Sequence, residues 1–352
     1  MNLVIDYNNI DYNKFLYDSS ITTLTVNDSN LTTLSLSELP QLKTIIFDNV
    51  RLFKIVIESL PNIKEISFNN CIIGTLTCEF LPNLESLIFD SNNTIIEVVL
   101  DNIPLVSKLT FVGKHNIKSL SVTRMESLTT ITSISINLGS LFLSDVESLK
   151  HLYIQNNKLG SLSLNDIPLL TKIFCQNNIY LEVVDLNLPL LQKFQASGCS
   201  IYSLSIKAPK LTYLNLNENN LKNIDLSTLP NLTQLYIDTN LLETLNVSNL
   251  DKLQKLYCEN NYWLSQLIFE PNDLICLSLQ ELVCNNSYIG NLDVSSLVNL
   301  RKLSASDCKL ISFKISPLTH LIDINISNNP SINSDNYSST LLECKKLKTI
   351  TL

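Results

Sequence analysis

Apolar and polar positions alternate along this chain in a pattern that returns about every twenty-one residues, from near Ile21 to the C-terminus. One clear copy opens at Leu232, continues through Leu235 and Ile237, and gives way to the next copy at Leu253. Each copy holds two short L-x-L segments, whose period of two predicts strands with alternate side chains pointing inward. A fixed period of this length predicts a solenoid of stacked coils, not a globular domain around one pocket.

The copies can be counted by the apolar residue that opens each of them. About sixteen openings follow one another, mostly in steps of twenty to twenty-two residues: Ile21, Leu42, Ile63, Leu84, Val106, Leu128, Leu149, Leu170, Leu191, Leu211, Leu232, Leu253, Leu279, Leu300, Leu321 and Leu347. The step after Leu253 is longer and carries an insertion near 269–276, and the last step contains a longer, more polar repeat over 329–346. Helical periodicity is limited to residues 338–346.

Each copy reads L-x-x-L-x-L-x-x-N-x-L-x-x-L-x-L-x-x-L-P-x, which resembles the leucine-rich repeat family, in a nested subclass with L-x-x-L-x-L in both halves. The resemblance implies a mainly β solenoid of about sixteen coils, with a parallel sheet on its concave side. The convex side is expected to be strand-like or irregular. The unbroken period predicts one solenoid domain over 21–352, with residues 1–20 as an N-terminal cap.

Two turns per copy have their own signals. An amide at the asparagine position can satisfy backbone groups buried where the chain turns inward, so these residues predict a ladder. The ladder position holds Asn92, Asn157, Asn178, Asn219, Asn240, Asn261 and Asn329, with Cys71, Cys199, Cys308, Ser29 and Ser287 as substitutes. A proline at a fixed later phase, as at Pro40 and Pro61, marks the second corner because proline cannot extend a strand ladder.

Composition excludes several classes of function. A net charge of −8 disfavours nucleic-acid binding. No apolar run is long enough to span a membrane, and no signal peptide is visible. Nine cysteines, mostly at inward or ladder positions, favour reduced thiols and a cytoplasmic location. Without a C-x-x-C pair or a phosphate-binding glycine loop, we expect no metal and no cofactor.

The candidate partner-binding residues lie between the inward leucines of the concave strands. Aromatic residues are common at exposed positions of the middle coils: Tyr153, Phe174, Tyr213, Tyr236 and Tyr257. A cationic row lies two residues after the openings, with His151, Lys172, Lys193 and Lys255 beside the aromatic stripe and Lys108 and Lys302 beyond it. An acidic row lies six residues after the openings, at Asp48, Asp90, Asp238 and Glu259. The two rows either pair across the coils or form a groove that orients a partner.

Other candidates have structural interpretations. His151 is a member of the cationic row rather than a catalytic base, so we expect no catalytic residue. Trp263, the only tryptophan, precedes the insertion and is expected to cover it. Asparagine-x-serine/threonine sequons are expected to be mostly accidental, because an asparagine-rich chain generates them by chance. At Asn92 a glycan is also expected not to fit, because this residue is assigned to the ladder.

The sequence therefore predicts a non-enzymatic scaffold that binds a protein partner on its concave face. Two alternatives remain open: a secreted or cell-surface recognition protein for a peptide or glycan, and a structural protein that self-assembles. A monomer is expected, although a final strand ending at Leu352 as an open edge would permit end-to-end association.

Overall fold

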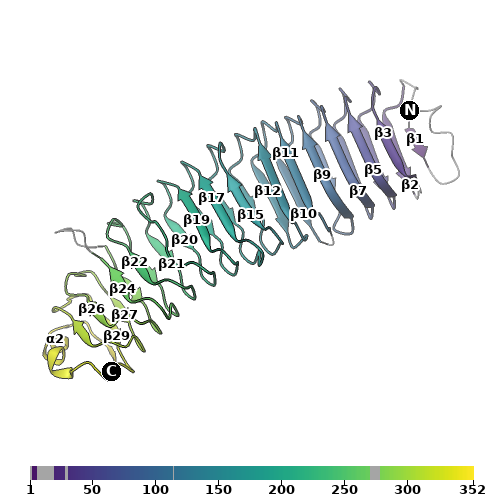
Figure 1. Ribbon diagram of the computed structural model, residues 1–352. Coiled ribbons are helices and arrows are strands. Elements are labelled where there is room, and N and C mark those ends of the chain that lie inside the picture. The colour runs from purple at the N-terminus through teal and green to yellow at the C-terminus, as the bar shows by residue number, and fades with distance from the viewer. Residues whose placement is uncertain (1, 6–19, 28–30, 114, 270–277) are drawn as a thin grey trace. The chain divides into compact units, whose positions relative to one another are not determined.

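The computed structural model describes residues 2–5, 20–27, 31–113, 115–269 and 278–352. The chain divides into two compact units, Met1–Leu181 and Glu182–Leu352, and each is described by itself. We call the strands that follow the repeat openings the front strands, and those in the second half of each copy the back strands. Figure 1 shows both kinds of strand stacked side by side within each unit.

The first unit has two parallel front sheets and one parallel back sheet. The first front sheet has the order β1 (Asn2–Ile5), β2 (Thr23–Asn27), β4 (Thr44–Asp48), β6 (Glu65–Asn69) and β8 (Ser86–Phe89). The second continues with β10 (Lys108–Val112), β12 (Thr130–Ile134), β14 (His151–Tyr153) and β16 (Lys172–Phe174). The back sheet contains β3 (Thr33–Leu36), β5 (Arg51–Glu58), β7 (Ile72–Glu79), β9 (Thr94–Asp101), β11 (Ser119–Thr123) and β13 (Ser140–Ser144), and β15 (Ser161–Leu164) is the next back strand along the chain.

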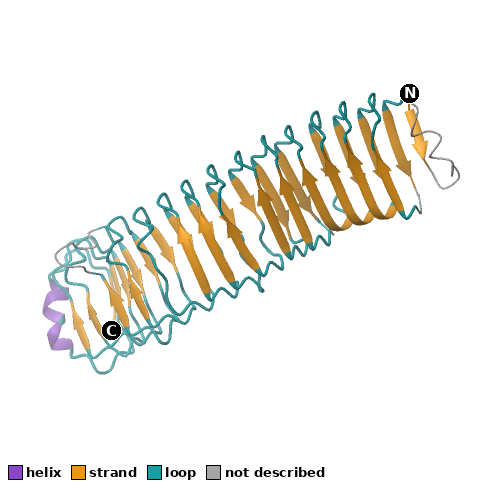
Figure 2. Cartoon of the chain, turned by 45° about the horizontal axis from the view of Figure 1, so that its top comes forward, coloured by secondary structure: helices purple, strands orange, loops and turns teal. Residues whose placement is uncertain are grey.

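In the second unit the front strands pair in parallel while the back strands form separate pairs. The front order is β18 (Lys193–Gln195), β20 (Tyr213–Asn215), β21 (Gln234–Tyr236), β23 (Lys255–Tyr257), β25 (Glu281–Val283), β27 (Lys302–Ser304), β29 (Asp323–Asn325) and β30 (Thr349–Thr351). The back pairs are β17 (Val183–Asn187) with β19 (Ser203–Lys207), β22 (Thr244–Asn246) with β24 (Gln266–Ile268), and β26 (Asn291–Asp293) with β28 (Ser312–Lys314). A 3₁₀ turn, η1 (Ser334–Asn336), and a short helix, α2 (Ser338–Leu342), lie in the last long repeat (Figure 2).

The predicted period is confirmed, because a front strand begins two residues after each of the sixteen openings. The mainly β solenoid with strand-like backs is therefore the observed fold. The helix expected over 338–346 ends earlier, at Leu342. The predicted cap and domain bounds stay a prediction, although β1 pairs in register with β2 and so adds a strand to the front sheet. Most of the insertion near 269–276 lies outside the described residues.

The front strands were expected to form a single parallel sheet, and this expectation is wrong for the first unit. Its front sheet is interrupted between β8 and β10. The break coincides with a step of twenty-two residues from Leu84 to Val106. It also coincides with Gly113, whose φ of +106° suits glycine and where a Cβ atom would lie 2.5 Å from the carbonyl oxygen of Ser91. The two front segments are still joined in the core, where Phe89 and Phe111 have ring centroids 4.7 Å apart.

Phenylalanines fill the core of the first coils. Phe47, Phe68, Phe89 and Phe111 occupy the same position in four successive coils and are buried. Their rings stack, with centroids 4.8 Å apart between Phe47 and Phe68 and 5.3 Å apart between Phe68 and Phe89. The aromatic rings of these four coils thus repeat at about the strand spacing of a sheet and contribute packing between successive coils.

The asparagine ladder is confirmed with one correction, and its predicted member Ser29 lies outside the described residues. Asn240 shows the pattern: its amide donates to the carbonyl oxygens of Leu216 at 2.9 Å and Ile237 at 3.2 Å, and accepts the N–H of Leu221 at 3.1 Å. In the coil that opens at Leu84 the ladder residue is Asn93, which is buried, and not Asn92, which is exposed. The prediction that Asn92 could not accommodate a glycan is therefore wrong.

Candidate protein-binding face

The front strands place the predicted site residues at fixed register positions. Side chains two, four and six residues after each opening point outward, because the residues between them point into the core. In the first unit His151 is in register with Lys172, and Tyr153 with Phe174. The rings of Tyr153 and Phe174 meet edge to face at 5.5 Å, and His151 lies 6.1 Å from Tyr153. Burial first, and then the charges of Lys172 and Lys150, lower the pKa of His151 and favour its neutral form.

A second aromatic group lies on the front of the second unit. Tyr236 and Tyr257 are in register on neighbouring strands, with ring centroids 5.2 Å apart and planes tilted by 30°. Tyr213 adds a third ring, 5.5 Å from Tyr236, from the column that also holds Lys193. All three tyrosines are half-buried. The predicted aromatic stripe from Tyr153 to Tyr257 is therefore two separate groups. In the two coils between them, the position four residues after the opening holds Gln195 and Asn215, which are not aromatic.

Polar contacts fix the orientation of the second group. The hydroxyl of Tyr257 donates to Glu281 Oε2 at 2.5 Å, and Lys255 Nζ lies 2.9 Å from Glu281 Oε1. Burial alone would raise the pKa of Glu281, but the Tyr257 hydrogen bond and the Lys255 ion pair together outweigh it and lower that pKa. The hydroxyl of Tyr236 donates to Gln234 Oε1 at 3.2 Å. These contacts hold the rings in place before any partner arrives.

Sequence reasoning missed Glu281, although the signal was present. Glu281 lies two residues after Leu279, which is the phase of the cationic row, and it stands in register between Lys255 and Lys302. In the second unit the charges at this position therefore alternate from Lys255 to Glu281 to Lys302. An ion pair forms between two members of the row, Lys255 and Glu281.

The expected pairing between the cationic and acidic rows is wrong for the described part of the chain. The four ion pairs found there are Lys64–Glu85, Arg124–Asp101, Lys255–Glu281 and Lys314–Asp293, and none joins one row to the other. The acidic row instead binds backbone: Asp238 Oδ1 accepts the N–H of Glu259 at 2.9 Å. At the same position of the preceding coil, Asn217 Oδ1 accepts the N–H of Asp238 at 2.8 Å.

Not every outward position is exposed, because three side chains that lie four residues after an opening are buried, namely Ser67, Val283 and Ser304. Lys108 and Lys193 are exposed, whereas Lys172 and Lys302 are half-buried. Trp263 is 69% exposed and lies next to the exposed Tyr262. Both follow the ladder residue Asn261, outside the front strands. Whether Trp263 covers the insertion stays a prediction, because residues 270–277 lie outside the described part of the chain.

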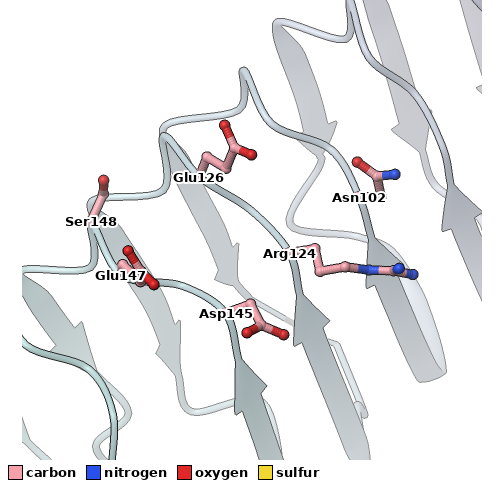
Figure 3. A pocket seen from close by; sticks show the side chains of 6 residues that line it. All are labelled: Asn102, Arg124, Glu126, Asp145, Glu147 and Ser148. Carbon is pink, nitrogen blue, oxygen red and sulfur yellow. The ribbon is translucent and has the colours of Figure 1, made fainter.

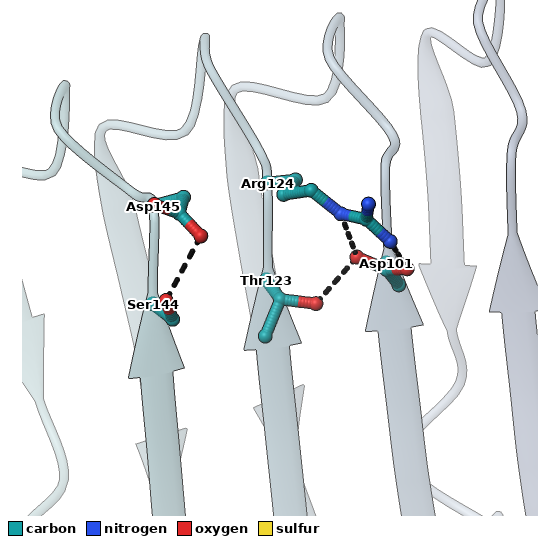
Figure 4. A network of polar contacts seen from close by, with 5 residues as sticks. All are labelled: Asp101, Thr123, Arg124, Ser144 and Asp145. Carbon is teal, nitrogen blue, oxygen red and sulfur yellow. Dashed lines mark hydrogen bonds and ion pairs between the residues drawn. The ribbon is translucent and has the colours of Figure 1, made fainter.

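A pocket of about 490 Å³ lies in the first unit, away from the predicted residues. Asn102, Arg124, Glu126, Asp145, Glu147 and Ser148 line it, all from the turns after β9, β11 and β13 (Figure 3). Its one cation is already engaged, because Arg124 forms a two-point contact with Asp101, which also accepts from Thr123 (Figure 4). Arg124 Cζ also lies over the ring of Phe80, 5.5 Å from its centroid. The network therefore connects the ends of three successive back strands, β7, β9 and β11.

Cysteine and histidine chemistry follows the fold. Burial raises the pKa of Cys71 to about 11 and also raises that of Cys78 and Cys258, which makes these thiols poor nucleophiles. Within the described residues no group of three or more histidine, cysteine or acidic side chains is arranged to hold a metal ion. The same part of the chain contains no helix long and apolar enough to cross a membrane.

Comparison with known proteins adds information on the fold. No family model and no curated protein matches the sequence. The structure is similar to that of the LRIM1/APL1C complex, with a TM-score of 0.53 and 17% identity over 97% of this chain and 63% of that chain. It is also similar to a leucine-rich repeat protein of Leptospira interrogans (TM-score 0.42, 18% identity, 98% and 99% covered) and to YopM from Yersinia enterocolitica (0.43, 19%, 94% and 87%). At these identities the likeness concerns the fold alone, and this chain spans less than two thirds of the LRIM1/APL1C chain that it matches.

Proposed function

Because this chain has the leucine-rich repeat fold, we propose that it is a non-enzymatic scaffold that binds a protein partner on the front face of its coils. Stacked coils present long rows of side chains that suit extended interfaces. The observation that carries the proposal is the group Tyr213, Tyr236 and Tyr257, three half-exposed rings in mutual contact on one sheet. Tyrosine is enriched where interfaces concentrate their binding energy.

The polar frame supports the same function. Tyr257 and Lys255 both contact Glu281, so neither side chain is free to rotate away. An interface whose anchors are held in advance loses less conformational entropy on binding. The pair Tyr153 and Phe174, with His151, forms a second and separate candidate surface in the first unit.

A matched pair of triple variants tests the proposal. Tyr213→Ala/Tyr236→Ala/Tyr257→Ala removes the front group, whereas Tyr202→Ala/Tyr262→Ala/Tyr288→Ala removes three tyrosines of the same unit that are 58%, 65% and 62% exposed and lie outside the front strands. Proteins captured by the wild type from extracts of the source cells are identified by quantitative mass spectrometry.

The expected result is a set of proteins retained by the wild type and by the control but lost, by about tenfold or more, from the front variant. Thermal unfolding establishes that both variants are folded. Equal recovery by both triple variants would exclude the front tyrosines as the binding surface.

We further propose a reducing compartment for this protein. The support is that buried thiols such as Cys71, Cys284 and Cys308 donate hydrogen bonds to backbone carbonyl groups inside the coils. The exposed sequon residue Asn92 supports the alternative of a secretory route. Intact-mass measurement of the native protein separates the two, since an occupied sequon adds the mass of a glycan.

A further inference from the structure

Two carboxylates lie beside the tyrosine pair of the second unit without a cation to neutralise them. Asp238 and Glu259 come two residues after Tyr236 and Tyr257 along the same segments, with buried Ile237 and Cys258 between them, so all four side chains face outward. Neither carboxylate takes part in any of the ion pairs found in the described ranges of the chain. The nearby Lys255 is held by Glu281.

The charge of Asp238 is not needed for the local backbone structure. Asp238 accepts the N–H of Glu259, but Asn217, a neutral amide, accepts the N–H of Asp238 at the same position of the preceding coil. Burial, and to a smaller extent the neighbouring charge of Glu259, raises the pKa of Asp238 to about 6, despite hydrogen bonds that favour the ionised form. The chain therefore carries an ionised aspartate where asparagine would be less costly, which is typical of sites kept for function.

We propose, building on the partner-binding role above, that Tyr236, Tyr257, Asp238 and Glu259 form a subsite for an arginine side chain in the protein partner. Aromatic rings attract cations, and the planar guanidinium group combines stacking on a ring with hydrogen bonds to carboxylates. Charge complementarity selects this occupant, because a basic group would supply the counter-charge that Asp238 and Glu259 lack. Glu259 Oε2 already accepts from Asn285 at 3.0 Å, which fixes its position while leaving Oε1 available.

The probe is a blocked tripeptide, acetyl-Gly-Arg-Gly-amide, titrated into the full chain while the ring NMR signals of Tyr236 and Tyr257 are followed. The same peptide with citrulline in place of arginine is the neutral control, since it keeps the shape and loses the charge. We expect saturable shifts of both rings with the arginine peptide and binding at least about tenfold weaker with citrulline. A lysine peptide should bind several-fold more weakly than arginine.

Two double variants with the same net charge distinguish the effect of the local site from the effect of the net charge. Asp238→Asn/Glu259→Gln should weaken arginine binding about tenfold, while Glu243→Gln/Asp251→Asn, two exposed acids elsewhere in the unit, changes the net charge equally and should leave it unaltered. Asp238→Asn retains the side-chain oxygen that accepts from Glu259, so the fold is expected to persist.

Binding should also strengthen several-fold between about pH 5 and about pH 7, because the carboxyl of Asp238 must be ionised to hold the cation. The groups close to it are Glu259, Tyr236, Tyr257, the buried thiol of Cys258 and the amide of Asn217, while arginine stays charged throughout.

Equal binding of the arginine and citrulline peptides, or unchanged arginine binding by Asp238→Asn/Glu259→Gln, would overturn the subsite. If the subsite fails while the front tyrosine variant still loses its captured proteins, the scaffold function stands without it. If the front tyrosine variant retains every captured protein, the proposed function itself fails.

Discussion

The two units build the back of the same repeat in different ways. In the first unit β5, β7 and β9 are eight residues long each and belong to one six-stranded sheet. In the second unit the back strands are three to five residues long and, within that unit, pair two by two. The front strands pair in parallel in both units, and the break between β8 and β10 occurs in the first unit.

The ladder position also differs between some of these coils. Where the coil carries Asn240 or Asn261, the side-chain amide accepts the backbone N–H of the preceding coil, from Leu221 and Leu242 respectively. Where it carries Val50 or Cys71, backbone groups pair directly instead: the N–H of Ile72 donates to Val50 at 2.8 Å and that of Thr94 to Cys71 at 2.7 Å. Buried backbone groups must be satisfied in both cases. A missing amide accompanies the long back strands β5 and β7, whereas β9 is equally long after Asn93, and the coils of Cys199 and Cys308 have short back strands.

The largest expected effect is on the core of the first unit. Phe68→Ala opens a cavity between the rings of Phe47 and Phe89 and should lower the free energy of unfolding by about 3–5 kcal/mol. Amide hydrogen exchange should show the loss of protection concentrated in the coils around Phe68, because repeats interact mainly with their neighbours. Phe68→Leu, which conserves most of the volume, should cost about 1 kcal/mol. Equal loss of protection in both units would contradict this localisation.

Asn240→Ala comes next in magnitude and addresses the ladder directly. It removes the acceptor for the buried N–H of Leu221 and the donor to Leu216 and Ile237, which should lower the free energy of unfolding by about 2–3 kcal/mol. The matched change in the first unit is Cys71→Ala, which leaves the backbone bonds of its coil in place and should cost about 1 kcal/mol.

Chemical denaturation of both variants, with exchange rates for the amide of Leu221, measures the difference. If Cys71→Ala proved as costly as Asn240→Ala, backbone pairing would not be a substitute for the amide.

The parts of the fold that the sequence could predict are those fixed by repeating apolar positions. The front strands begin two residues after their openings because burial of alternate side chains leaves no other register. The length of β5 did not follow from the leucine pattern, since it depends on which backbone groups the residue at Val50 leaves to be paired. Asn93 was missed because the coil that opens at Leu84 places its ladder residue one position later.

The candidate site shows the same limit. The positions of Tyr213, Tyr236 and Tyr257 within their repeats were enough to place them on one face. The observed ring contacts agree with that placement. Phase could not show that Glu281 holds Lys255, nor that Asp238 has no cation, because both depend on the direction of long side chains. Pairing between rows was therefore expected where the structure shows pairing within one row.

The smallest expected effect concerns His115, a buried residue at the C-terminal end of the phenylalanine stack. Its ring meets Phe89 and Phe111 edge-on at 6.3 and 6.1 Å, and neither ring nitrogen has a hydrogen-bond partner among the described residues. His115→Phe should therefore raise the free energy of unfolding by about 1–2 kcal/mol at neutral pH, since it removes two unsatisfied polar atoms from the core. Denaturant titration of the wild type and the variant measures this gain.

The pH dependence sharpens the test. Burial lowers the pKa of His115, and the charge of Asp90 opposes this only in part, so the unfolded chain takes up a proton more readily than the folded one. The wild type therefore has its full stability above the ordinary histidine pKa of about 6.5 and loses stability as the pH falls below it. His115→Phe should not show this loss, so the gain in stability should widen towards about pH 5. A constant difference across that range would mean that His115 is neutral or charged alike in both states, and that the first unit tolerates polar groups in its aromatic core.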